Sequence, residues 1–103
     1  MDRLAGKVAL ITGGGKGIGR GIALCMAKEN AKVVIGCHSS PDRAAQTLAD
    51  LRVHTEAELI CSDVSTEEGC KALVDGTVRA FGKIDILVNN AALQTHHTML
   101  ETD

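Results

Sequence analysis

The chain has 103 residues, of which 45% are hydrophobic and 23% are charged, and its formal net charge at pH 7 is −2. This profile describes one small globular domain, excludes a disordered or fibrous segment, and offers no charge excess that would attract nucleic acid or an anionic membrane. Neither a signal-peptide pattern nor an apolar run near the roughly 20 residues of a membrane span is visible, so we expect a cytoplasmic protein with no membrane partner.

Apolar runs with the composition of strands alternate along the chain with segments of helical periodicity. The expected strands cover residues 7–12, 31–37, 56–61 and 84–88, and the expected helices cover residues 17–29, 41–51 and 66–81. The order βαβαβαβ predicts right-handed crossovers and a parallel sheet.

The first and third expected helices carry the clearest patterns. In the first, Ile18, Ile22 and Met26 recur at every fourth position with Ala23 and Ala27 beside them, which predicts one apolar stripe along the helix. Ser65 has the spacing of a capping box at the start of the third helix, and Gly82 should end that helix. The apolar face predicted for the third helix consists of Cys70, Leu73, Val74, Thr77, Val78 and Phe81.

Four cysteines stand far apart in the sequence, at Cys25, Cys37, Cys61 and Cys70. They form neither the C-x-x-C pairs of a zinc site nor a dense disulfide framework. We therefore expect free thiols in a reducing compartment, with Cys25 and Cys61 as small apolar core residues. A redox role for Cys37 is the alternative.

The first expected strand is joined to the first helix by the glycine-rich residues 12–19, with the sequence TGGGKGIG. Backbone amides and the positive end of a helix meet at such a connection, where they can hold a dinucleotide pyrophosphate. A side chain at Gly13 would obstruct the turn, one at Gly17 would hold the phosphates away, and one at Gly19 would separate the helix from the strand. The stretch therefore predicts a dinucleotide site, with a purely structural loop as the alternative.

With this GxxxGxG spacing the sequence resembles the N-terminal half of the short-chain dehydrogenase/reductase family. Two further motifs stand in the family's order: Asp63-Val64 follows the third strand, and residues 89–92, with the sequence NNAA, match the family's NNAG motif. Ala92 replaces the last glycine of that motif. The resemblance covers essentially the whole chain and implies an incomplete Rossmann-type doubly wound parallel sheet of four strands and three helices. The sequence is also similar to the glucose dehydrogenase and 3-oxoacyl-carrier-protein reductase branches.

The resemblance also implies which residues contact a nicotinamide dinucleotide. Asp63 and Val64 would meet the adenine, Asn90 and Ala91 would meet the ribose on the nicotinamide side, and Asn89 would tie neighbouring strands together. From the residues alone, Asp63 could instead cap the third helix, and residues 89–91 could form only a turn. Because Ser65 is expected to supply that cap, we expect Asp63 to be free. The contacts implied in the glycine loop are Thr12, Gly13, Gly15, Lys16, Gly17, Ile18 and Gly19.

The end of the second strand bears on the choice of cofactor. NAD-binding folds place an Asp or Glu about 20 residues after the glycines to hold the ribose hydroxyls, and here Cys37 stands near that place. A thiol does not repel a 2′-phosphate, so we expect NADP to be preferred over NAD. The residues that could surround such a phosphate are Lys16, His38, Ser39 and Ser40. Alternatively, Lys16 and His38 are only solvated surface residues.

The chain contains no Tyr, whereas the family reduces a carbonyl with a Tyr as proton donor and with a Lys, a Ser and an Asn that lie beyond the motif at Asn89. We therefore assign no catalytic residue. We also assign no metal ligand, because the adjacent His96 and His97 would point apart on a strand or helix.

Residues 1–103 are thus expected to be the cofactor-binding domain of an oxidoreductase, truncated before its catalytic half. The resemblance implies a small carbonyl or alcohol substrate and a homo-oligomer in the full-length form. The alternative is a standalone nucleotide-binding or regulatory module without turnover.

The expected topology also leaves one strand exposed. The first two helices should cover one face of the sheet and the third helix the other, so residues 84–88 should form an apolar edge that is unpaired on its outer side. We expect the chain, made alone, to be marginally stable and to self-associate through this edge.

Overall fold

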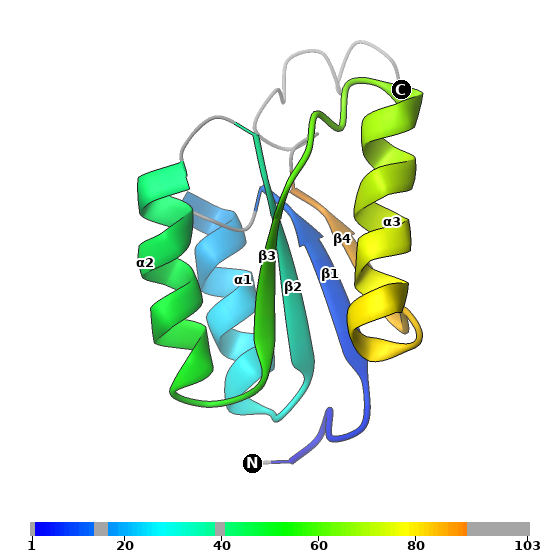
Figure 1. The fold of residues 1–103 in the computed structure, drawn as a ribbon. Helices are drawn as coiled ribbons and strands as arrows, with labels where there is room; N and C mark the ends of the chain where they lie inside the picture. The colour runs from blue at the N-terminus through cyan, green and yellow to red at the C-terminus, as the bar shows by residue number, and fades with distance from the viewer. Residues whose placement is uncertain (1, 14–16, 39–40, 91–103) are drawn as a thin grey trace, which may run out of the picture.

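The computed structural model describes residues 2–13, 17–38 and 41–90, which form a parallel sheet with helices on both faces (Figure 1). The strands are β1 (Val8–Thr12), β2 (Lys32–Cys37), β3 (Ala57–Cys61) and β4 (Ile86–Asn89), and the helices are α1 (Gly17–Lys28), α2 (Pro41–Arg52) and α3 (Glu67–Phe81). The strand order is β3-β2-β1-β4. The predicted order of elements and the parallel sheet are confirmed, although each strand begins one or two residues later than expected.

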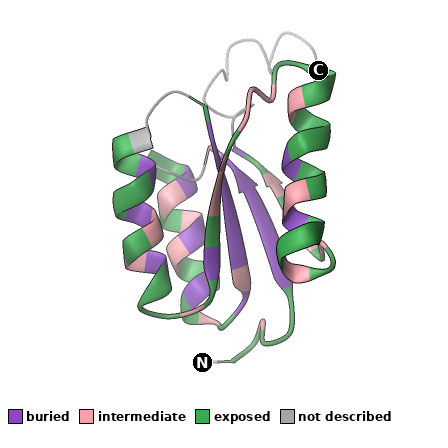
Figure 2. Ribbon diagram, in the orientation of Figure 1, coloured by how far each residue is buried: buried purple, intermediate pink, exposed green. Residues whose placement is uncertain are grey.

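The two central strands are buried from both sides. Helices α1 and α2 lie on one face of the sheet and α3 lies on the other, as predicted (Figure 1). Ile11 belongs to the core on the α1 and α2 side, whereas the neighbouring Leu10 packs with Leu73 of α3. Because both faces are covered, nearly all residues of β1 and β2 are buried, as the purple colour in Figure 2 shows. This burial explains why the two strands are largely apolar in sequence.

Helix α1 packs against the sheet through small residues. Gly19, Ala23 and Ala27 are buried, whereas Ile18 is 69% exposed and the next two members of the predicted isoleucine and methionine stripe are half-buried. The predicted period is correct, and Ala23 and Ala27 of the predicted stripe are buried, but its larger members are not. Small side chains allow the helix to approach the sheet closely.

Helix α3 is capped by a different residue from the one predicted. Thr66 is the N-cap, and its hydroxyl oxygen accepts a hydrogen bond from the Gly69 backbone N–H at 2.9 Å. The Ser65 hydroxyl instead donates to Asp63 Oδ1 at 2.6 Å. The prediction that Ser65 caps the helix is therefore wrong. Asp63 does not cap the helix, as expected, but Ser65 occupies one of its carboxylate oxygens.

Only part of the predicted apolar face of α3 is buried. Leu73 and Thr77 are buried, but Val74 is 41% exposed, Val78 is 43% exposed, and Cys70 is also exposed. Within the described part of the chain, α3 is the one helix on its face of the sheet, so its flanks are not covered. The helix ends at Gly82 as predicted, with a left-handed φ of 84°.

The cysteines also lie differently from the expectation. All four are free, but Cys25 and Cys61 are exposed, whereas Cys37 is buried. Cys25 lies on α1 outside the buried stripe of small residues, and Cys61 is the last residue of the edge strand β3. The prediction that Cys25 and Cys61 are core residues is therefore wrong, because neither side chain is surrounded by other residues.

Strand β4 forms the opposite edge of the sheet. It pairs with β1 and, among the described residues, with no other strand. Leu87 on this strand is 62% exposed, in agreement with the predicted apolar edge. None of the helices within the described ranges is long and apolar enough to cross a membrane.

Candidate functional site

The ends of the strands bring the predicted site residues to one edge of the sheet. The register aligns Thr12 at the end of β1 with Gly36 of β2 and with Asn89 of β4. It also aligns Cys37 at the end of β2 with Cys61 of β3. Residues that the sequence only placed after separate strands therefore share the carboxyl edge, which is where open α/β sheets bind their ligands.

The glycine turn adopts a backbone conformation that suits glycine at both of its described ends. Gly13 has a φ of 67° and Gly17 a φ of 60°, both in the left-handed region. The Gly13 N–H donates to the Gly36 carbonyl oxygen at 3.0 Å, which ties the start of the turn to β2. The first turn of α1, which starts at Gly17, contains no acidic residue. Its N-terminal amides and positive dipole end therefore favour an anion.

Gly19 brings α1 into contact with this turn. A Cβ at Gly19 would lie 2.2 Å from the Gly13 carbonyl oxygen and 2.6 Å from Asn90 Nδ2. Real Cβ atoms do not approach backbone oxygen so closely, so a side chain here would displace the helix or the turn. This agrees with the prediction that Gly19 is needed for close packing of the helix.

Asn90 connects the end of β4 with the glycine turn. Its side chain is fully buried, and Nδ2 donates to the Gly13 carbonyl oxygen at 3.1 Å. Its Oδ1 is buried without a hydrogen-bond partner among the described residues. The side chain thus lies against the turn, while its contact with a ribose stays a prediction. The neighbouring Asn89 accepts from the Thr12 hydroxyl at 3.1 Å, which confirms that it ties β4 to β1.

His38 and Asp63 face each other across the ends of β2 and β3. His38 Nε2 lies 3.8 Å from Asp63 Oδ2, and the two side chains are 64% and 42% exposed. The other carboxylate oxygen of Asp63 accepts from the Ser65 hydroxyl and backbone N–H. These hydrogen bonds, with a smaller effect from His38, hold the pKa of Asp63 below its usual value. Asp63 is therefore negatively charged at neutral pH.

The two thiols at the ends of β2 and β3 form a pair that sequence reasoning missed. Cys37 is 7% exposed, and the strand register places it beside Cys61. Partial desolvation and then the neighbouring Cys37 raise the pKa of the Cys61 thiol. The sequence places both residues at strand ends, but it does not give the register that aligns them.

Val64, which follows Asp63, packs against the Leu10 and Leu73 core.

Several predicted site residues lie outside the described residues: Gly15, Lys16, Ser39 and Ala91, together with Ser40, His96 and His97. The roles expected for these residues are therefore predictions from the sequence alone. In the ranges that the structure describes, no group of three or more His, Cys, Asp or Glu could hold a metal ion.

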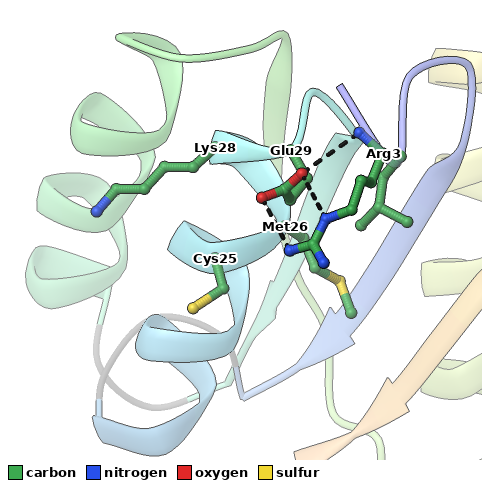
Figure 3. Close-up of a pocket in the computed structure, with 6 residues that line it drawn as sticks. Arg3, Cys25, Met26, Lys28 and Glu29 are labelled. Atoms are coloured by element: carbon green, nitrogen blue, oxygen red, sulfur yellow. Dashed lines mark hydrogen bonds and ion pairs between the residues drawn. The ribbon is translucent and has the colours of Figure 1, made fainter. Parts of the chain in front are cut away.

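A separate shallow pocket of about 360 Å³ lies beside the C-terminal end of α1, away from the glycine turn (Figure 3). The Arg3 guanidinium there forms an ion pair with Glu29, with Nε 3.0 Å from Oε1, and this contact lowers the pKa of Glu29. Arg3 and Glu29 thus neutralise each other, and none of the predicted cofactor residues contributes to the pocket. The lining residues are Arg3, Leu4, Cys25, Met26, Lys28 and Glu29.

Comparison with known proteins gives consistent matches. A family model described as short chain dehydrogenase matches residues 7–103. NADPH-dependent aldehyde reductase 1, chloroplastic, of Arabidopsis thaliana is 39% identical over 107 residues, covering 97% of this chain and 37% of that protein. Glucose 1-dehydrogenase 2 of Bacillus subtilis (strain 168) is 43% identical over 89 residues, covering 85% of this chain and 34% of that protein. The chain therefore spans about a third of the length of these curated relatives.

Solved structures give the same result. A dehydrogenase/reductase from Sinorhizobium meliloti 1021 matches with a TM-score of 0.80 and 37% identity, over 84% of this chain and 34% of that chain. The NADH-dependent reductase A1-R′, crystallised with NAD, matches with a TM-score of 0.78 and 34% identity, over 85% of this chain and 37% of that chain. Sequence and fold thus point to one family.

Proposed function

This chain belongs to the short-chain dehydrogenase family, and we propose that its carboxyl edge binds a nicotinamide dinucleotide within an oxidoreductase that interconverts a small carbonyl compound and its alcohol. The packing of Gly19 against the Gly13 carbonyl is the observation that carries this proposal. It holds the N-terminus of α1 against the turn, where a pyrophosphate would meet backbone amides. The relatives named above are reductases and dehydrogenases, which favours an oxidoreductase over a standalone binding module.

The residues at this edge fit such a cofactor. The first amides of α1 would hold the pyrophosphate, with Gly17 leaving open space above the backbone. The unpartnered Oδ1 of Asn90 is a buried acceptor that a ribose hydroxyl would satisfy. Asp63 would meet the adenine through the carboxylate oxygen that faces His38. When bound, the nicotinamide supplies or accepts the hydride.

We propose that NADP is preferred over NAD. Cys37 places no carboxylate at the end of β2, so nothing on that residue would repel a 2′-phosphate. His38 follows it with an exposed imidazole that can donate to the phosphate. One matched reductase is named for NADPH and another for NADH, so the preference rests on these residues of the chain.

Calorimetric titration of NADP⁺ and NAD⁺ tests both proposals. The chain should bind NADP⁺ more tightly than NAD⁺, and Gly19→Ala should lose this binding. Gly21→Ala is the matched control, because a Cβ there meets no atom within 4 Å. Equal affinities, or tighter binding of NAD⁺, would reject the preference for NADP but not the proposed site. Failure of the folded chain to bind either dinucleotide would reject the site.

We also propose that these 103 residues do not catalyse the reaction on their own. The proton donor of the family is a Tyr, and the chain contains none. Absorbance of the reduced cofactor should stay constant with sugars, polyols and 3-oxoacyl substrates. Turnover that survives removal of contaminating enzymes and disappears in Gly17→Trp would contradict this.

A further inference from the structure

The pairing of β2 with β3 places two cysteines directly beside each other. Cys37 and Cys61 are register partners in this parallel pair. Ile35 and Leu59, two positions earlier on each strand, belong to the core on the α1 and α2 side. Because side chains alternate along a strand, both thiols point to that same face.

This arrangement meets the first geometric requirement of a disulfide, which is the separation of the two Cα atoms. Neighbouring strands lie about 4.8 Å apart. A disulfide accepts Cα separations of about 4.4 to 6.8 Å. Side chains that share one face can rotate about their own bonds, which brings the two sulfur atoms toward each other.

The two thiols differ in access, which sets the order of their reactions. Cys61 is exposed at the end of the edge strand, whereas Cys37 is 7% exposed behind it. A small oxidant therefore meets Cys61 first. Partial desolvation and the contact with Cys37 raise the pKa of its thiol, so mildly alkaline solution favours attack by its thiolate.

We propose that Cys37 and Cys61 are an oxidisable dithiol that closes to an intrachain disulfide across the ends of β2 and β3. The oxidant is a low-molecular-weight disulfide such as oxidised glutathione. The Cys61 thiolate attacks one glutathione sulfur, forms a mixed disulfide and releases the other glutathione as a thiolate. The Cys37 thiolate then attacks the Cys61 sulfur and releases the second one. The two cysteines lose two protons and two electrons, and the electrons reduce the glutathione disulfide to two thiols.

The remaining cysteines provide internal controls. Cys25 lies on the surface of α1, and Cys70 at the start of α3 donates its S–H to the Val64 carbonyl oxygen at 3.1 Å. Neither is the register partner of another cysteine in the sheet. They should accept glutathione without passing it to a neighbouring thiol.

Equilibration with oxidised glutathione at mildly alkaline pH, followed by peptide mapping under non-reducing conditions, tests the proposal. A peptide pair joined through Cys37 and Cys61, with two hydrogen atoms lost, is the expected product. The Cys25→Ser/Cys70→Ser double variant should give the same product. In Cys37→Ser, glutathione should remain on Cys61, and in Cys61→Ser, Cys37 should stay largely unmodified.

Three results would overturn the proposal. The first is that glutathione persists on Cys61 of the wild-type chain. The second is that the disulfide joins a different pair of cysteines. The third is that the disulfide joins two copies of the chain. The wild-type peptide map decides between these products and the expected one even if Cys37→Ser, at a buried position, does not fold.

Discussion

Asn90 Nδ2 donates a hydrogen bond to the Gly13 carbonyl oxygen at 3.1 Å and so joins the end of β4 to the glycine turn across 77 positions of sequence. A Cβ on Gly19 would lie 2.2 Å from the same carbonyl oxygen. Three segments that are distant in the chain therefore meet at one backbone atom. The shape of the turn depends on the start of α1 and on the end of β4 together.

Asn90→Asp should destabilise the fold. The substitution replaces the N–H donor with a carboxylate oxygen that faces the Gly13 carbonyl in a buried place. A buried group left unsatisfied costs about 1 to 3 kcal/mol, and a buried charge costs more. A protonated carboxyl group can donate a hydrogen bond again, so the loss of stability in Asn90→Asp should become smaller as the pH falls. Urea unfolding at neutral and acidic pH measures both effects.

The control for this prediction is the same change one position earlier. Asn89 is exposed, and Asn89→Asp keeps the oxygen that accepts from the Thr12 hydroxyl. Its loss of stability should be clearly smaller than that of Asn90→Asp. Equal losses in the two variants would show that the Asn90 side chain does not hold the turn.

Cys37→Asp should reverse the cofactor preference toward NAD. A carboxylate at the end of β2 can accept from both ribose hydroxyls and repels a 2′-phosphate. We expect the ratio of the two affinities to change by about tenfold or more, which is about 1.4 kcal/mol. Calorimetry on the variant measures this, with circular dichroism to show that it folds. Cys25→Asp, on the surface of α1, should leave the ratio unchanged, and an unchanged ratio in Cys37→Asp would contradict the argument.

Asp85 should make the fold sensitive to acid. Its Oδ2 accepts from the Val8 N–H at 2.9 Å and lies 3.1 Å from Lys83 Nζ, so the pKa of Asp85 in the folded chain is below its usual value near 4. A lowered folded-state pKa contributes stability above the unfolded-state value, and this contribution is lost as the pH falls through the folded-state pKa. Asp85→Asn should therefore be less stable than the wild type at pH 7.

The stability difference between Asp85→Asn and the wild type should decrease progressively below about pH 4. Urea unfolding over a pH series measures the difference. Asp75→Asn removes an exposed carboxylate on α3 and should show no comparable pH-dependent difference. A difference for Asp85→Asn that does not change with pH would disprove the role of its charge.

Leu87→Lys should reduce self-association of the isolated chain. Leu87 is 62% exposed on β4, which pairs with β1 alone among the described strands. A lysine on an exposed edge opposes pairing with another chain. Sedimentation at micromolar concentration should show association in the wild type and less in the variant. Val53→Lys changes a residue that is 79% exposed after α2 and should have no effect. A wild-type monomer that unfolds cooperatively would contradict the prediction.

The sequence predicted what depends on local chemistry. The alternation of strands and helices, the break at Gly82 and the close approach at Gly19 all follow from residue type and period, and the structure agrees with them. Contacts that depend on how distant segments align were not visible. The pairing of Cys37 with Cys61 needs the β2 and β3 register, which no local pattern encodes.

Two further errors concern the choice between neighbouring residues. The cap of α3 is Thr66 rather than Ser65, because Ser65 bonds with the Asp63 carboxylate instead. At the start of α1 the buried residue is Gly19 rather than Ile18, because the Gly13 carbonyl and Asn90 leave no room there for a side chain. In both places a neighbouring residue with the same spacing satisfies the pattern equally well, and only the packing decides between them.

The binding of the dinucleotide at the carboxyl edge is tested most directly by following the backbone amide signals of the chain by NMR during titration with NADP⁺. The signals of Gly13, Ile18 and Asp63 should shift in a saturable way, whereas those around the pocket of Arg3 and Glu29 should not. Signals that shift only around that pocket, or no shifts at saturating NADP⁺ and NAD⁺, would contradict the site.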